Sequence, residues 1–349
     1  MQAIVEQFQT QIRAATAAKT PLRLRGGGTK DWYGNAPVGT VLDTRAYSGV
    51  LAYEPTELVV TARCGTPLAE IEALLARHHQ MLAFEPPRFG ADSTIGGVVA
   101  SALSGPRRAS AGAVRDFVLG AVLMDGSGEV LRFGGQVMKN VAGYDVSRLL
   151  AGSLGTLGLI MEVSLKVLPL PVREASLCFE MGEIEALAKL NDWAGQPLPI
   201  SASCWHRGVL SLRLSGAGAA VEAAQRKLGG AELPDAEAFW TSLRDQRHGF
   251  FDCASLWRLS LPQQASAMVL NGEQLIEWGG AQRWLAADAG AAAQIRANAA
   301  AAGGHATLFR AADKSVGAFH PLAPAVARIN QRLRQEFDPA GIFNPGRMY

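Results

Sequence analysis

The order of apolar and polar residues predicts a chain in which helices and strands are mixed. At the start, Ile4, Phe8 and Ile12 recur at helical spacing among polar residues, which predicts an amphipathic helix. The run 67–80 has the same period, with Leu68, Ile71 and their neighbours on one face. Short runs rich in β-branched residues predict strands at 21–26, 41–45, 58–62 and 157–169.

One segment predicts a hairpin, and the later part of the chain predicts a second sheet. Residues 116–135 contain two strand-forming runs joined by a turn from Asp125 to Gly128. Further runs at 201–206, 209–216 and 256–262 predict more strands, interleaved with helices. Because no regular βαβ repeat is present, the expected fold class is α+β rather than a doubly wound sheet.

The distribution of glycine and alanine indicates where one domain ends. Before Pro171 the glycines occur in tight groups, whereas residues 217–312 are rich in alanine, with helical stretches that end in glycine pairs. Pro169 and Pro171 end a strand and begin a connector. We therefore expect three parts, at 1–171, 172–322 and 323–349.

Composition excludes several classes of protein. Thirty-three basic against 31 acidic side chains give a net charge of +2, too small for the field of a nucleic-acid binder. The hydrophobic fraction of 48% allows a large core. No segment is long and apolar enough for a signal peptide or a membrane span, so we expect a cytoplasmic protein that reaches the membrane only through partner subunits.

The four cysteines exclude two kinds of metal site. They are far apart and form no CxxC pair, so neither a zinc knuckle nor an iron–sulfur motif is present. We expect buried thiols in a reducing compartment, and no bound metal.

The sequence RGGGT, from Arg25 to Thr29, is the first candidate for chemistry. A strand that leads into three glycines exposes several backbone N–H groups, which can hold an anion such as a pyrophosphate. The alternative is a tight structural turn. A P-loop motif is absent, and Gly152, Gly155 and Gly158 lack the Rossmann spacing. With so little net charge, we expect N–H groups rather than a basic field to recognise the anion.

Two more segments are rich in small residues. Residues 93–116 would let a flat ligand approach the backbone, with Ser93, Thr94 and Ser101 as donors; close helix packing explains the pattern equally well. Residues 139–160 fit either a ligand-binding loop or a helix that a glycine loop separates from a strand.

The order and spacing of these segments resemble a known family. RGGGT, EPP, TIGGVVAS and the run that ends in LKVLP resemble, over the first 171 residues, the FAD-binding domain of the vanillyl-alcohol oxidase (PCMH-type) family. FDPAGIFNPGRMY at the end is similar to that family's C-terminal flavin-contacting segment. Chain length, LWRLSLP and this ending resemble the smaller, E-type FAD-binding subunits of bacterial glycolate oxidases in particular.

The resemblance implies a fold and a cofactor site. It implies a two-subdomain FAD-binding domain, an α+β cap, and a C-terminal segment that returns to the flavin. It implies non-covalent FAD, because Thr29 and Lys30 stand where some members carry a flavin-bonded histidine. The implied FAD-binding residues are Arg25, Gly26, Gly27, Gly28, Thr29, Pro87, Thr94, Gly96, Gly97, Ser101, Asp116, Gly155, Leu157, Ile160 and Asn344.

The catalytic half of the resemblance is less complete. In the similar 2-hydroxy-acid dehydrogenases the flavin takes a hydride, while a histidine and a metal held by a His/Glu cluster polarise the hydroxyl group. Here the six histidines are scattered, and His78 and His79 are expected on the surface. The catalytic candidates are His305, Arg310 and Arg258, the last as a partner for a substrate carboxylate. A structural histidine and a strand ion pair are the alternative roles.

The resemblance therefore implies the FAD-binding subunit of a glycolate oxidase complex that oxidises glycolate, a small 2-hydroxy acid, to glyoxylate. A sister FAD-linked oxidase subunit and an iron–sulfur subunit are the expected partners. Three alternatives stay open: a self-sufficient FAD-linked 2-hydroxy-acid dehydrogenase, an assembly subunit without a redox role, and a UDP-sugar enoyl reductase. The last is disfavoured because the second domain does not resemble its substrate domain.

Overall fold

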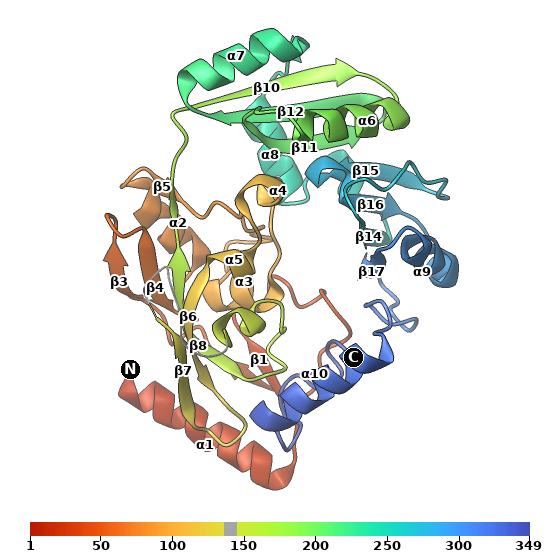
Figure 1. Cartoon of the computed structure of the whole chain (residues 1–349). Helices are drawn as coiled ribbons and strands as arrows, with labels where there is room; N and C mark the ends of the chain where they lie inside the picture. The colour runs from red at the N-terminus through yellow and green to blue at the C-terminus, as the bar shows by residue number, and fades with distance from the viewer. Residues whose placement is uncertain (136–144) are drawn as a thin grey trace.

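The computed structural model describes residues 1–135 and 145–349, and it contains two large antiparallel sheets (Figure 1). The first sheet has the strand order β3-β4-β8-β6-β7. Its strands are β3 (Val50–Glu54), β4 (Val59–Arg63), β8 (Leu159–Lys166), β6 (Val118–Met124) and β7 (Val130–Gly134). Beside it, β1 (Leu22–Arg25) and β2 (Thr40–Asp43) form a parallel pair, and β5 (Gln80–Met81) pairs with β9 (Leu168–Pro169).

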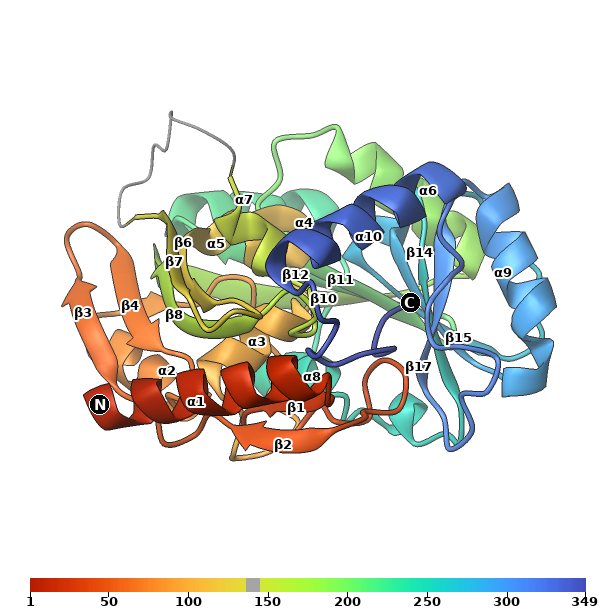
Figure 2. The ribbon, with the colours of Figure 1, turned by 90° about the horizontal axis from the view of Figure 1, so that it is seen from below.

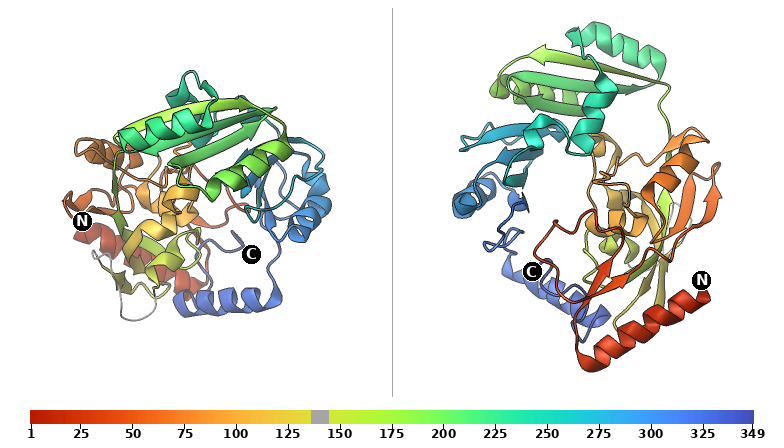
Figure 3. Two further views of the ribbon diagram at one scale, coloured as in Figure 1. Left: turned by 45° about the horizontal axis from the view of Figure 1, so that its top comes forward. Right: turned by 180° about the vertical axis from the view of Figure 1, so that it is seen from behind.

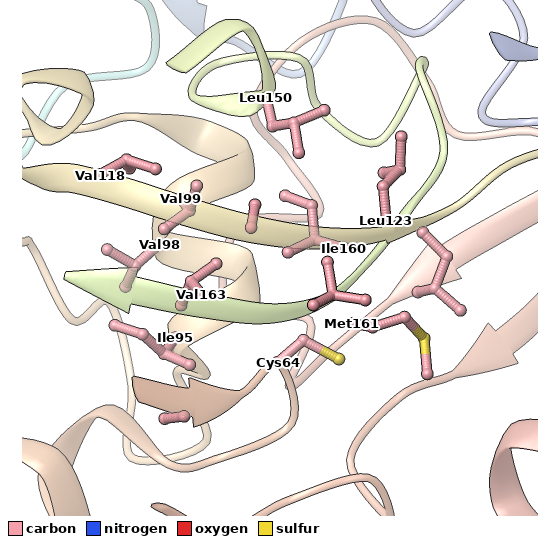
Figure 4. Close-up of a cluster of buried hydrophobic side chains, with 14 of the residues drawn as sticks. Cys64, Ile95, Val98, Val99, Val118, Leu123, Leu150, Ile160, Met161 and Val163 are labelled. Carbon is pink, nitrogen blue, oxygen red and sulfur yellow. The ribbon is translucent and has the colours of Figure 1, made fainter. Parts of the chain in front are cut away.

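Helices cover the first sheet and form a core with it. The helices of this part are α1 (Gln2–Ala18), α2 (Leu68–Ala76), α3 (Ile95–Ser101), α4 (Arg108–Ala111), α5 (Val114–Phe117) and the 3₁₀ turn η1 (Ser147–Leu150). Figure 4 shows Val98 and Val99 of α3 packed beside Val163 of β8. The seven residues of β6 are all buried, because the strand lies between two neighbours and has covered faces.

The second sheet has eight strands in the order β13-β10-β12-β11-β15-β16-β14-β17. They are β10 (Arg173–Glu180), β11 (Ile200–His206), β12 (Val209–Gly216), β13 (Ala231–Glu232), β14 (Leu256–Ser260), β15 (Glu273–Glu277), β16 (Gln282–Ala286) and β17 (His305–Arg310). The sheet lies over the N-terminal part and bends to one side of it (Figures 1 and 3).

The two faces of the second sheet pack against different partners. The associated helices are α6 (Glu183–Ala194), α7 (Gly218–Leu228), α8 (Ala236–Arg244), α9 (Ala292–Ala301), and the 3₁₀ turns η2 (Gly249–Phe251), η3 (Trp278–Gly280) and η4 (Ala289–Ala291). Because side chains alternate along a strand, Trp257 and Leu259 of β14 join the core under α9. Leu256 points to the opposite face, where it packs in one cluster with Tyr33 and Leu103 from the N-terminal part.

A buried ion-pair network also joins the second sheet to the N-terminal part. Arg107 pairs with Glu85 at 3.4 Å and with Glu174 of β10. Arg213 of β12 pairs with Glu85 at 2.8 Å and lies 5.2 Å from the centroid of the Trp240 ring. Both arginines are less than a tenth exposed, so their charges are compensated by these carboxylates while Ser215 and Ser201 accept further hydrogen bonds from them.

The C-terminal helix α10 (Pro324–Phe337) leads the chain back to its beginning. After α10, Phe343 forms a parallel bridge with Leu22 of β1, and the tail lies beside β1 (Figure 2). None of the helices within residues 1–135 and 145–349 has the length and hydropathy that a bilayer crossing requires.

Most of the expected elements are confirmed. The α+β class, the first helix, α2, the hairpin of β6 and β7, and the strands β11, β12 and β14 all occur where the pattern predicts them. The hairpin's first strand begins at Val118 rather than Asp116, because residues 114–117 form a short helix. The expectation of four buried thiols is wrong for Cys178 and Cys253, which are partly exposed.

Candidate functional site

The loop after β1 carries a row of free backbone donors. Among the residues that the structure describes, no acceptor bonds the N–H groups from Gly26 to Lys30. The loop is partly buried, and Gly28 has a φ of 72°. Folded proteins leave very few such groups without a partner, so a run of five indicates solvent or an anion in front of the loop.

Two of the three glycines are required by close packing. A Cβ on Gly27 would lie 1.6 Å from the carbonyl oxygen of Asp92, and one on Gly26 would lie 2.3 Å from Oγ1 of Thr94. The loop therefore lies directly against the segment that enters α3, where only a residue without a side chain fits.

The loop forms one wall of a groove that we call the glycine groove. It is two adjoining cavities lined mainly by the loop 23–31, α3, the segment 154–160 and Asn344. Four basic side chains line it, Arg23, Arg25, Lys30 and Arg347, against one acidic residue, Asp31. Four minus one gives a local charge of +3, which exceeds the net charge of the whole chain. Basic residues are therefore concentrated beside the free N–H groups, although the net charge of the chain is small.

Lys30 differs from the other basic residues of the groove. Arg23 and Arg25 both pair with Asp31, at 2.5 and 2.8 Å. Lys30 donates to Oγ of Ser93 at 3.0 Å and forms no ion pair with any described carboxylate. Burial lowers the pKa of Lys30 to about 8. A bound anion would compensate this desolvated ammonium group.

The second predicted cluster packs closely against β4 and also lines the glycine groove. Thr94 caps α3 by accepting from the N–H of Gly97 at 3.4 Å. A Cβ on Gly96 would lie 2.6 Å from Cβ of Cys64, so this glycine allows close packing between α3 and the end of β4. Gly97 and Ser101 line the groove. Small residues thus let the helix pack closely on one side while they leave room for a ligand on the other.

The third predicted cluster meets the C-terminal tail. Residues 139–144 of this cluster lie outside the described residues; the rest comprises the 3₁₀ turn η1, a glycine loop and β8. A Cβ on Gly155 would lie 2.7 Å from Nδ2 of Asn344, which donates to the carbonyl of Leu154 at 2.6 Å. The loop and the tail therefore close the groove together.

The structure places twelve of the fifteen predicted cofactor residues along the glycine groove. They are Arg25, Gly26, Gly27, Gly28, Thr29, Thr94, Gly96, Gly97, Ser101, Gly155, Ile160 and Asn344. Pro87 lines a separate small cavity beneath the second sheet, and Leu157 lines a larger one beside α10. Asp116 is exposed and accepts from the N–H of Ala113 at 2.8 Å, so it caps the short helix α5.

The three catalytic candidates are not brought together in one cavity. Arg258 donates to the hydroxyl of Tyr33 at 3.1 Å and lines the same small cavity as Pro87. His305 begins the edge strand β17 and is exposed. Arg310 donates to the carbonyl of Phe251. Only Arg258 among them faces a cavity next to the N-terminal part.

The remaining histidines and cysteines form no metal site. His78 and His79 are exposed, as expected. Within the described ranges, no three His, Cys, Asp or Glu side chains are placed to hold an ion. Burial raises the pKa of the Cys64 thiol to about 12, so this cysteine, although it lines the groove, stays protonated.

Sequence reasoning missed Lys30, Arg23 and Arg347 as residues that line the groove. Arg347 donates to the backbone oxygen of Asp31 at 2.8 Å, across 316 residues. The available signal for Lys30 was its place directly after the glycine loop.

The groove suits an elongated anionic ligand with a flat apolar part. Its donors are backbone N–H groups and cations at one end, and its walls elsewhere are glycines, Ala100, Leu154 and Ile160. A dinucleotide with a pyrophosphate and an aromatic ring system has these properties.

Some known proteins match the whole chain, and others match about half of it. A sequence model described as an FAD binding domain matches residues 3–134. Over 349 residues the chain is 50% identical to glycolate oxidase subunit GlcE of Escherichia coli, covering 100% of this chain and 97% of that protein.

Other relatives match about half of the chain. Glycolate oxidase subunit GlcD of Bacillus subtilis is 32% identical over 174 residues, and a D-lactate dehydrogenase of Archaeoglobus fulgidus is 31% identical over 167 residues. Each match spans 37% of that relative's length. The solved structure of alkyldihydroxyacetonephosphate synthase has a TM-score of 0.67 at 15% identity, covering 97% of this chain and 74% of that one; it shows the fold alone.

Proposed function

Because the chain belongs to the PCMH-type family of FAD-binding proteins that contains glycolate oxidase subunit GlcE, we propose that it is the FAD-binding subunit of a glycolate oxidase complex. The complex oxidises glycolate, a 2-hydroxy acid, to glyoxylate. The supporting observation is the glycine groove, with a local charge of +3 and five consecutive N–H donors that no described residue accepts from.

The residues of the groove fit FAD. The N–H groups of Gly26 to Thr29 and the ammonium of Lys30 would hold the pyrophosphate. Gly97 and Ser101 would contact the ribityl chain and the flavin ring system, and Gly155 and Ile160 would flank the nucleotide end. When bound, FAD supplies an acceptor for a hydride from the substrate carbon.

We propose that FAD is held without a covalent bond. Thr29 and Lys30 occupy the positions after the glycines, and no histidine lines the part of the groove that the structure describes. The proposed partners are a sister flavoprotein subunit, similar to GlcD, and an iron–sulfur subunit that passes the electrons on. The proposed location is the cytoplasm, at the membrane through these partners.

The visible spectrum of the purified chain tests the central claim. We expect flavin absorption bands that pass into the supernatant after acid precipitation, as non-covalent FAD does. A colourless chain that takes up no added FAD would overturn the proposal. Bands that remain in the precipitate would overturn only its non-covalent part.

A variant tests the redox role within the complex. In Gly27→Asp, the new side chain would collide with the backbone of Asp92 and add a negative charge to the loop, so FAD should be lost. We then expect the co-purified complex to lose glycolate-dependent reduction of a dye. Full activity in a complex whose subunit lacks FAD would favour an assembly role instead.

A further inference from the structure

The segment that follows the glycine loop, residues 30–35, is held by two parts of the chain that lie far away in the sequence. The first is the loop after β17, residues 311–318, in which the N–H of Ala318 donates to Oδ1 of Asn35 at 2.8 Å. The second is the C-terminal tail, where Arg347 donates to the backbone oxygens of Asp31 and Asn35. The position of the segment 30–35 therefore depends on both of these parts.

Lys314 is the cation that the loop after β17 places against this segment. Its Nζ donates to the backbone oxygens of Trp32 at 2.6 Å, Phe309 at 3.0 Å and Gly34 at 3.2 Å. All three donors of the ammonium group are thus used on carbonyl groups. The side chain is partly buried and forms no ion pair with a described carboxylate. A lysine withdrawn from solvent without an acidic partner is unusual, so these contacts need a specific reason.

Aromatic rings hold the same segment against the second sheet. The centroid of the Trp32 ring lies 5.1 Å from that of Phe309 in β17, and the centroid of the Tyr33 ring lies at the same distance from it. Tyr33 and Phe309 belong to one buried cluster. The second sheet therefore contacts the segment 30–35 through side chains as well as through the amine of Lys314.

Trp32 connects this contact to the glycine loop. Its Nε1 donates to the backbone oxygen of Thr29 at 3.0 Å, and the N–H of Asp31 donates to that of Gly28 at 3.1 Å. In a planar trans peptide the C=O and N–H groups point in opposite directions. Because the two oxygens are held on one side, the N–H groups of Thr29 and Lys30 point to the other side, where no described residue accepts from them.

We propose that Lys314 is a positioning residue for FAD, which fixes the segment 30–35 and so directs the free N–H groups of the glycine loop toward the pyrophosphate. The inference rests on the proposed function, because FAD is the proposed ligand of the groove. Lys314 does not line the groove in the described part of the chain, so it acts through the loop. The second sheet thereby affects how tightly the N-terminal part holds FAD. Such coupling is reciprocal, so bound FAD also stabilises the contacts of Lys314.

Lys314→Met tests this role, because methionine keeps the length of the side chain and has no N–H donors. We expect this variant to bind FAD about tenfold more weakly, as measured by quenching of FAD fluorescence. Riboflavin, which has no phosphates, should bind the wild type and Lys314→Met equally. An unchanged affinity for FAD, or an equal loss for riboflavin, would overturn the inference.

Lys314→Arg tests whether the donors of the side chain carry the effect. Arginine keeps a positive charge and several N–H donors, so this variant should bind FAD within about threefold of the wild type. An arginine variant as weak as Lys314→Met would count against the proposed role. Melting curves like that of the wild type exclude unfolding as the cause of any loss.

Arg296→Met is the matched control. Arg296 of α9 donates to the backbone oxygens of Val316 and Gly317, so it holds the same loop as Lys314 without a described hydrogen bond to the segment 30–35. Its variant should change the affinity for FAD by less than about twofold. An equal loss in Arg296→Met and Lys314→Met would show that the stability of the loop matters rather than the contacts of Lys314, and the inference would fail.

Hydrogen exchange of the wild-type chain tests the coupling without a substitution. FAD should slow exchange in residues 305–318, because bound FAD and the contacts of Lys314 favour each other. In Lys314→Met saturated with FAD, exchange in these residues should not respond to the cofactor. If FAD leaves their exchange unchanged in the wild type, the inference fails while the proposed FAD-binding function stands. If the wild type takes up no FAD, the proposed function fails, which the visible spectrum shows separately.

Discussion

The side-chain oxygen of Asn344 accepts a hydrogen bond of 2.9 Å from the backbone N–H of Leu24, which lies 320 residues earlier in the chain. The Nδ2 of the same residue donates to the carbonyl of Leu154, and its backbone N–H donates to Leu22. One side chain thus fixes strand β1, the glycine loop before β8 and the C-terminal tail around a common groove. The groove is complete only when both ends of the chain are in place.

Asn344→Ala should therefore weaken both folding and cofactor binding. The change leaves the Leu24 N–H and the Leu154 carbonyl without their partner, which costs about 1–3 kcal/mol. Urea unfolding should show this loss, and quenching of FAD fluorescence should show weaker binding. Asn330→Ala, on the exposed face of α10, removes only a bond to the Val326 carbonyl and should leave both values unchanged. An Asn344→Ala variant with wild-type stability would contradict this role.

Gly27→Ala should abolish most FAD binding. The new Cβ would lie 1.6 Å from the Asp92 oxygen, so the loop must move away from α3 and its N–H groups lose their common direction. We expect a loss of affinity of about tenfold or more, measured by FAD titration.

Gly182→Ala is the control for Gly27→Ala. Gly182 has a φ of −68° and no atom within 4 Å of its Cβ position, so alanine there should bind FAD normally. Tight FAD binding by Gly27→Ala would show that the loop does not contact the cofactor.

The sequence predicted the elements with regular periodicity, and it predicted the glycine loop that forms one wall of the glycine groove. Strands such as β12 and helices such as α2 form where their apolar residues recur, because local pattern and burial agree there. RGGGT was recognisable because three adjacent glycines expose backbone N–H groups, although the triplet alone also fits a structural turn. Most of the other residues that line the groove were predicted from the resemblance to a family.

What the sequence did not show depends on contacts between distant segments. Arg347 meets the loop after β1 only because the tail returns, and no periodicity encodes that approach. Trp284 and Gln282 lie beside the carboxyl group of Glu277 only because the register of β15 and β16 places them there. The carboxylate of Asp116 could contact a polar ligand, but in the structure it accepts a hydrogen bond from the backbone N–H of Ala113 and caps a helix.

Lys30→Met should weaken FAD binding in a pH-dependent way. Burial lowers the pKa of Lys30 to about 8, so in the wild type the cation disappears as the pH rises through that value. Wild-type affinity for FAD should therefore fall above about pH 8, whereas the variant should bind weakly at every pH. Lys189→Met, on the exposed side of α6, should behave like the wild type. Riboflavin, which lacks phosphates, should bind the wild type and Lys30→Met equally; a loss for riboflavin too would show that Lys30 does not act on the phosphates.

Glu85→Gln should destabilise the contact between the second sheet and the N-terminal part. Glu85 bridges Arg107 of the N-terminal part and Arg213 of β12, and neutralising it leaves two buried guanidinium groups with too little negative charge. Removing one partner of a buried pair costs about 3 kcal/mol, so the melting temperature should fall.

The position of Glu85 predicts how Glu85→Gln fails. Because the network lies between the sheets and away from the glycine loop, FAD binding at low temperature should persist while proteolysis of the second sheet accelerates. Glu237 is an exposed carboxylate of α8 that lines a pocket together with Glu85 and Arg213, and Glu237→Gln should change neither property. If Glu85→Gln melts like the wild type, the arginines must find other partners, and the aromatic contacts of Tyr33 and Phe309 would then have to hold the two parts together.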